Sequence, residues 1–175
     1  MSKARLYFIR AINVGGASLP MAELRSIAVT LGATGVQTYI ASGNLLCVPP
    51  DDADAFERQL ERAIKDQFGF FREVISRSRP EVQAALAAYP FNVLNPKFSY
   101  ITFLQSQPTP DAVARARTFD TGADQWEVIG REMHIRYEDG AGRPQMKDAS
   151  IMRALAVAGT ARNLNTVRKL LSISE

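Results

Sequence analysis

The sequence predicts an α+β protein built from two halves, each a small antiparallel sheet with helices packed on one of its faces. Two observations lead to this prediction. Strand-like and helix-like segments alternate along the whole chain, and the order of elements in the first half recurs in outline in the second. The first order, β-α-β-β-α-β, is that of the ferredoxin-like fold. We therefore expect two ferredoxin-like subdomains, residues 1–78 and residues 79–175.

In the first half, runs of aromatic and β-branched residues predict strands, and apolar residues spaced by three and four predict helices. The resulting elements are a strand at 5–11, a helix at 20–31, a hairpin of 36–41 and 45–48, a helix at 52–68 and a strand at 70–76. The hairpin turn is Ser42-Gly43-Asn44, where Gly-Asn supplies the positive φ values that a tight turn needs.

In the second half, Ser78 and Glu81 have the spacing of a capping box at the start of a helix. The predicted elements are a helix at 79–88, a strand at 98–104, a helix at 110–118, strands at 125–129 and 132–137, and a helix at 147–158. Residues 163–171 then keep helical spacing where the first half has its last strand. The second half is thus predicted as β-α-β-β-α, a repeat of element order without similarity of residues.

Composition narrows the class of protein. A chain of 175 residues with 46% hydrophobic residues can bury its own core without disulfides or metals. Its single cysteine, Cys47, lies in an apolar run and is expected to be buried, and the sequence shows no secretory signal and no transmembrane segment. We expect a cytoplasmic protein without a membrane anchor. The net charge of +3 is compatible with an anionic partner.

Three motifs resemble a known family. They are Phe8-Ile9-Arg10-Ala11-Ile12-Asn13-Val14-Gly15-Gly16, Thr38-Tyr39-Ile40-Ala41-Ser42-Gly43-Asn44 and Thr160-Ala161-Arg162-Asn163-Leu164-Asn165-Thr166-Val167. Together they resemble the bacterial family called domain of unknown function 1697. The sequence departs from the family at Ala11, Ala41 and Leu164, where glycine, glutamine and tryptophan are usual. The resemblance implies an α+β fold of two ferredoxin-like subdomains and no known activity.

The loop Asn13-Val14-Gly15-Gly16 is the first candidate site, because adjacent glycines can bring main-chain N–H groups close to an anion. It matches neither a dinucleotide-binding fingerprint nor a P-loop. The alternative is a strand-to-helix turn that needs glycine for its backbone angles. Asn44 could lie beside this loop, although a hairpin turn explains the segment around it without a ligand.

The second candidate site is the segment Thr160 to Thr166. From Ala149 to Ser174 the chain carries four arginine and lysine residues and no acidic residue. Arg162, Asn163 and Asn165 offer donors where the last helix is expected to begin, which suits a phosphate or carboxylate. The alternative is that Thr160, Asn163 or Asn165 caps the helix and that Arg162 lies on the surface or pairs internally.

The remaining candidates are weaker. The only histidine, His134, is expected to be a solvated strand residue, and no catalytic residue is assigned. One histidine, one cysteine and no carboxylate cluster predict no metal site, and no cofactor is expected. The basic and aromatic signature of an RNA-recognition module is missing, so nucleic acid is a second choice of partner. The first expectation is a binder of a small phosphate- or carboxylate-bearing ligand, and a structural or interaction protein is the third.

Overall fold

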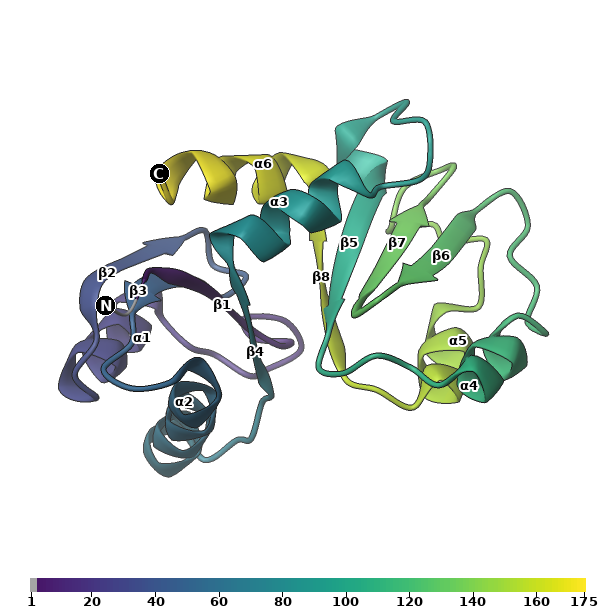
Figure 1. Cartoon of the computed structure of the whole chain (residues 1–175). Helices are drawn as coiled ribbons and strands as arrows, with labels where there is room; N and C mark the ends of the chain where they lie inside the picture. The colour runs from purple at the N-terminus through teal and green to yellow at the C-terminus, as the bar shows by residue number, and fades with distance from the viewer. Residues whose placement is uncertain (1–2) are drawn as a thin grey trace. The chain divides into compact units, whose positions relative to one another are not determined.

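The computed structural model describes residues 3–175, which form two compact units (Figure 1). Unit 1 contains the described residues up to Val82 together with Leu170–Glu175, and unit 2 contains Gln83–Lys169. The boundary predicted between residues 78 and 79 lies just before this division. The last residues, which the prediction gave to the second half, group with unit 1.

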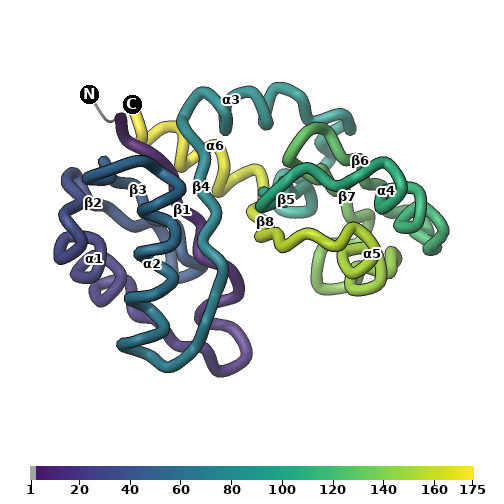
Figure 2. The backbone as a smooth tube through the Cα atoms, turned by 60° about the horizontal axis from the view of Figure 1, so that its bottom comes forward, coloured from purple at the N-terminus to yellow at the C-terminus, as the bar shows by residue number. Residues whose placement is uncertain are grey.

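Unit 1 has a four-stranded antiparallel sheet in the order β2-β3-β1-β4. Its elements are β1 (Arg5–Ile9), α1 (Met21–Thr30), β2 (Thr34–Tyr39), β3 (Asn44–Val48), α2 (Ala53–Phe68) and β4 (Val74–Ser78), followed by the start of α3 (Arg79–Ala87). Alternate residues of the strands, such as Tyr7, Ile9 and Cys47, pack against Leu24, Leu60 and other apolar residues of α1 and α2. Figure 2 shows both helices side by side on this face of the sheet.

Unit 2 repeats the arrangement with the sheet order β6-β7-β5-β8, also antiparallel. Its elements are the short 3-10 helix η1 (Pro96–Phe98), β5 (Ser99–Leu104), α4 (Pro110–Ala116), β6 (Gln125–Ile129), β7 (Glu132–Arg136), α5 (Asp148–Leu155) and β8 (Gly159–Asn163), after which α6 (Leu164–Ile173) begins. Its core gathers Trp126, Met133 and Ile135 from the sheet with Ile151 and Leu155 from α5.

The prediction for the second half was wrong in one respect, because it ended α5 three residues late and missed β8. Residues 159–163 read Gly-Thr-Ala-Arg-Asn, which contains little of the β-branched and aromatic character that marks a strand. They form a strand because β5 offers its free edge to them, with Tyr100 opposite Asn163 and Leu104 opposite Gly159. Unit 2 is therefore β-α-β-β-α-β, and the ferredoxin-like order is complete in both units.

The two units also correspond residue by residue at their last strands. Arg77 of β4 lies opposite Leu6 of β1, and Arg162 of β8 lies opposite Ile101 of β5. Both arginines are buried, and the Nη1 atom of each donates to the main-chain oxygen of the preceding residue at 2.9 Å. The stretch Arg77-Ser78-Arg79-Pro80-Glu81-Val82 thus matches Arg162-Asn163-Leu164-Asn165-Thr166-Val167. The two junctions therefore share a buried arginine in the same register, within a repeat of element order.

Strand β4 forms an edge of the unit 1 sheet, and carboxylates cover its outward N–H groups. The main-chain N–H of Val74 donates to Glu61 at 3.0 Å, and that of Ser76 donates to Glu57 at 2.8 Å. The N–H of Ser78 donates to Glu81 at 2.6 Å. An exposed strand edge would otherwise invite pairing with another chain. Burial raises the pKa of Glu57 above its ordinary value, although its hydrogen bonds to Ser76 oppose this shift.

Neither a membrane-spanning helix nor a cluster of metal-binding side chains occurs within residues 3–175. No helix in that range is long and apolar enough to cross a membrane. Within the same range, no group of three or more histidine, cysteine or acidic side chains is arranged to hold a metal ion.

Candidate functional site

The loop that joins β1 to α1 is held in place by the side chain of Asn13. Its Nδ2 atom donates to the main-chain oxygens of Leu19 at 2.9 Å and Ala41 at 2.6 Å, and its Oδ1 atom accepts from the N–H of Leu19 at 2.8 Å. The main-chain N–H of Asn13 also donates to the oxygen of Ala17 at 2.6 Å. Asn13 therefore closes the loop and ties it to the β2–β3 turn.

Inside this closed loop, five consecutive main-chain N–H groups, those of residues 14–18, donate to no acceptor in the described chain. Asn13, Gly15 and Gly16 have φ values of 57°, 62° and 101°. Left-handed residues interspersed in a turn can point successive N–H groups into one concavity, which is a common way to bind an anion. A hollow of about 260 Å³ is lined by Asn13, Gly15, Gly16, Ala17 and Ser18.

A third segment, which precedes β4, also reaches this loop. The Nε atom of Arg72 donates to the main-chain oxygen of Ala11 at 3.2 Å, and Arg10 forms an ion pair with Glu73 at 3.1 Å. The N–H of Arg10 donates to the oxygen of Glu73 at 3.0 Å. Three segments thus meet at one end of the unit 1 sheet, namely residues 10–18, 40–43 and 71–73. We call this region the loop end of unit 1.

Backbone strain concentrates at the loop end. Among the described residues, four that are not glycine have positive φ, and three of them, Ala11, Asn13 and Ile40, belong to these segments. A β-branched residue such as Ile40 is rarely found in this conformation. Strained residues of this kind gather at functional sites, where the surrounding structure holds them.

Asn44 lies next to the same turn but is fully engaged with it. It is 1% exposed, and its Nδ2 atom donates to the main-chain oxygen of Tyr39 and to the hydroxyl of Ser42, both at 3.0 Å. Gly43 supplies a positive φ of 87°. The hairpin was predicted correctly, and Asn44 stabilises its turn.

Arg162, Asn163 and Asn165 belong to unit 2, at the junction of β8 and α6. Arg162 is 6% exposed, and its Nη1 atom donates to the hydroxyl of Thr160 at 2.6 Å. Burial lowers the pKa of Arg162 to about 10, which leaves it charged at neutral pH. Asn163 accepts from the N–H of Thr166 at 2.9 Å and so caps α6, while Asn165 is exposed in the first turn of that helix.

His134 was expected to be solvated, and this was wrong because it is 0% exposed. Both ring nitrogens lack a hydrogen-bond partner, and the ring meets that of Tyr89 edge to face at 5.6 Å between centroids. Burial lowers the pKa of His134 to about 4, although the charge of Glu127 on the neighbouring strand opposes the shift. The imidazole is therefore neutral at physiological pH, and its burial speaks against a role as a general base.

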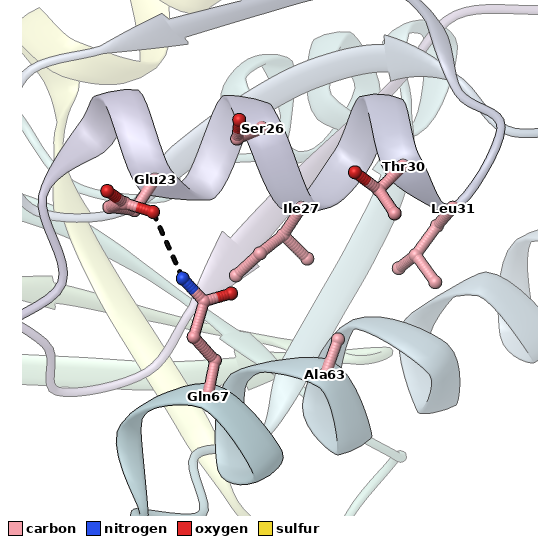
Figure 3. Close-up of a pocket in the computed structure, with 7 residues that line it drawn as sticks. All are labelled: Glu23, Ser26, Ile27, Thr30, Leu31, Ala63 and Gln67. Atoms are coloured by element: carbon pink, nitrogen blue, oxygen red, sulfur yellow. Dashed lines mark hydrogen bonds between the residues drawn. The ribbon is translucent and has the colours of Figure 1, made fainter.

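A second hollow, of about 230 Å³, lies between α1 and α2 (Figure 3). Ile27, Leu31 and Ala63 form its apolar part, and Gln67 Nε2 donates to the Glu23 carboxylate at 3.0 Å across it. Glu23 is the one charged side chain that lines this groove. Because its negative charge would repel an anion, the groove does not suit a phosphate or carboxylate.

The two units differ at the loop end in the length of one connection. Residues 10–20 connect β1 to α1, whereas the shorter segment 105–109 connects β5 to α4. By contrast, the N–H of Arg10 donates to the oxygen of Glu73 just as that of Gln105 donates to the oxygen of Ala158. The longer loop of unit 1 therefore has no counterpart of equal length between β5 and α4 of unit 2. Sequence reasoning found this loop through its glycines but gave no signal for Arg72.

Comparisons with known proteins are consistent with this architecture. The model of a family described as "Protein of unknown function (DUF1697)" matches residues 2–134. The structure of the conserved bacterial protein SP0830 from Streptococcus pneumoniae resembles the chain with a TM-score of 0.80 and 19% sequence identity, over 99% of both chains. A putative glycine cleavage system transcriptional repressor aligns with a TM-score of only 0.23 at 12% identity, over 91% of this chain and 95% of that one. No curated protein sequence matches.

Proposed function

The chain belongs to the DUF1697 family of proteins of unknown function, and on that premise we propose from its own residues that it binds a small ligand carrying a phosphate or carboxylate group in the loop 13–18. The observation that carries this proposal is the run of five main-chain N–H groups without acceptors, in a segment whose residues 15–18 line a hollow of about 260 Å³. Main-chain amides held in a fixed concavity need no reorganisation to receive an anion.

The charges at the loop end support an anion. Arg10 is balanced by its ion pair with Glu73, whereas Arg72 has no acidic partner in the described chain. The region thus carries one unbalanced positive charge beside the loop. A guanidinium group in this position attracts phosphate and carboxylate groups.

The asparagines support the proposal by holding the loop rather than by touching the ligand. Both polar atoms of the Asn13 side chain are occupied within the loop, and the Nδ2 atom of Asn44 is occupied within the hairpin turn. Preorganisation of this kind raises affinity because little conformational freedom remains to be lost on binding. The ligand contacts that we propose are the N–H groups of residues 14–18, which include Gly15 and Gly16, together with Arg72.

The experiment is a titration with inorganic phosphate and with acetate, followed by amide NMR. Chemical shifts of residues 14–18 should move saturably, while those of the groove between α1 and α2 should stay in place. Gly15→Ala is the test variant and Gly35→Ala is its matched control. The two glycines have φ values of 62° and 60°, and in both an added Cβ meets no atom within 4 Å.

Both substitutions should lower stability by about 1 kcal/mol, because alanine is strained in the left-handed region. Only Gly15→Ala should weaken phosphate binding, by about fivefold, since the same strain then opposes the binding-competent loop. Equal affinities for the two variants, or shifts spread over the whole protein, would refute the proposed site.

Arg162→Ala belongs in the same titration. The sequence-based hypothesis assigns Arg162, Asn163 and Asn165 to the ligand as well, whereas the proposal made here needs only unit 1. If Arg162→Ala retains the affinity of the native chain for phosphate, the loop end is sufficient. If it abolishes binding while residues 14–18 keep their native shifts, Arg162 must be added to the site.

A further inference from the structure

Three large apolar side chains are exposed at the loop end, one on each of its three segments. Val14 is 63% exposed, Ile40 is 48% exposed and Phe71 is 49% exposed. Each is the chain neighbour of a residue whose hydrogen bond joins the segments. Val14 follows Asn13, Ile40 precedes Ala41, and Phe71 precedes Arg72.

This distribution is uneven, because only five large apolar residues of the described chain are at least 48% exposed, and three of them lie at the loop end. Single exposed apolar residues are ordinary, whereas several that gather around a polar site mark a surface for binding. Ile40 is displayed by a left-handed backbone conformation that β-branched residues seldom adopt. The ring of Phe71 makes no contact with another ring or with a cation in the described chain.

Arg72 connects the apolar residues to the loop. Its Nε and Nη1 atoms donate to the main-chain oxygens of Ala11 and Phe71, at 3.2 and 2.8 Å, and its guanidinium lies 5.3 Å from the centre of the Phe70 ring. The Nη2 atom of Arg72 donates to no acceptor in the described chain. One cationic donor of Arg72 therefore remains available at the loop end.

Building on the proposed function, we infer that the ligand is an organic phosphate with a flat apolar body, the chemistry of an aryl or nucleoside monophosphate. Its phosphate group occupies the N–H groups of residues 14–18 and the free donor of Arg72. Its body covers Phe71 and the side chains of Val14 and Ile40. Such a ligand would bury the apolar surface that the protein alone leaves in water.

The test compares three probes by calorimetry and amide NMR, namely inorganic phosphate, phenyl phosphate and phenol. Phenyl phosphate should bind about tenfold more tightly than inorganic phosphate, the gain expected from one stacked ring. Phenol alone should not bind measurably. Phe71→Ala should remove the gain for phenyl phosphate and leave the affinity for inorganic phosphate unchanged.

Phe119→Ala is the matched control, because Phe119 is a 37% exposed phenylalanine of unit 2. It should bind both phosphates as the native chain does. Equal affinities of the native chain for the two phosphates would overturn this inference and leave the proposed function standing. Failure of both to bind would overturn both. Vesicles of anionic lipid serve as an additional probe. Binding to them without affinity for phenyl phosphate would overturn this inference and show that the apolar side chains meet a membrane surface instead.

Discussion

His134 makes the stability of unit 2 depend on pH. The buried imidazole has a pKa of about 4, against the ordinary value of 6.5 that it regains on unfolding. Between these values the unfolded chain binds a proton that the folded chain does not, so stability falls as the pH falls from about 6.5 to about 4. Above that window both states are neutral at this residue, and below it both are charged.

The size of the effect follows from the two pKa values. Lowering the pH from about 7.5 to about 5 should reduce the free energy of unfolding by about 2 kcal/mol through His134, since each unit of pKa difference corresponds to about 1.4 kcal/mol. The groups nearest the ring do not change this sign. Glu127 opposes the shift and is already included in the value, and Tyr89 presents a neutral ring edge to face.

Urea unfolding followed by tryptophan fluorescence is the suitable assay, because the single tryptophan, Trp126, is buried in the core of unit 2. The native chain is compared with His134→Leu and with His134→Gln, and each is measured at both pH values. The difference between the two pH values should be about 2 kcal/mol smaller in the variants than in the native chain. If all three chains lose the same stability on acidification, His134 does not carry the effect and its burial has been misjudged.

Three further predictions concern single residues. Glu61→Ala should lower the free energy of unfolding by about 1–3 kcal/mol, because it leaves the buried N–H of Val74 without an acceptor. Hydrogen exchange at that N–H should accelerate, and unchanged protection would contradict this role. Asn163→Ala should destabilise α6 by about 1 kcal/mol through loss of its cap, as measured by urea unfolding. Ala11→Gly should raise stability by about 1 kcal/mol by relieving a φ of 50°, and an unchanged or lower melting temperature would argue against strain at this position.

Local patterns in the sequence were sufficient for most elements. The spacing of apolar residues predicted α2 at 52–68, where the structure has Ala53–Phe68, and the strand at 125–129 was predicted without error. The capping box of Ser78 and Glu81 is present, with hydrogen bonds of 3.2 and 2.6 Å. These features depend on contacts between residues that are close in the chain, so their signals survive in a single sequence.

Features fixed by distant contacts could not be predicted in this way. The strand predicted at 70–76 was placed too early, because the aromatic residues at its start favour a strand. In the structure the strand begins only at Val74, where β1 pairs with it and the carboxylates of α2 accept from it. At the candidate site, the glycines of the loop were visible. The tie from Asn13 to Ala41 and the approach of Arg72 to Ala11 join segments far apart in the sequence, so neither left a local signal.

The sequence by itself determined the fold class, the order of most elements, the burial of Cys47 and the family, because periodicity, turn residues and motifs are local properties of the chain. Only the tertiary structure decided that Gly-Thr-Ala-Arg-Asn forms a strand, that His134 is buried, and that three segments meet at the loop end of unit 1. The physical reason is that strand pairing and burial are set by the free energy of the whole packed arrangement, which can override the preference of any short segment.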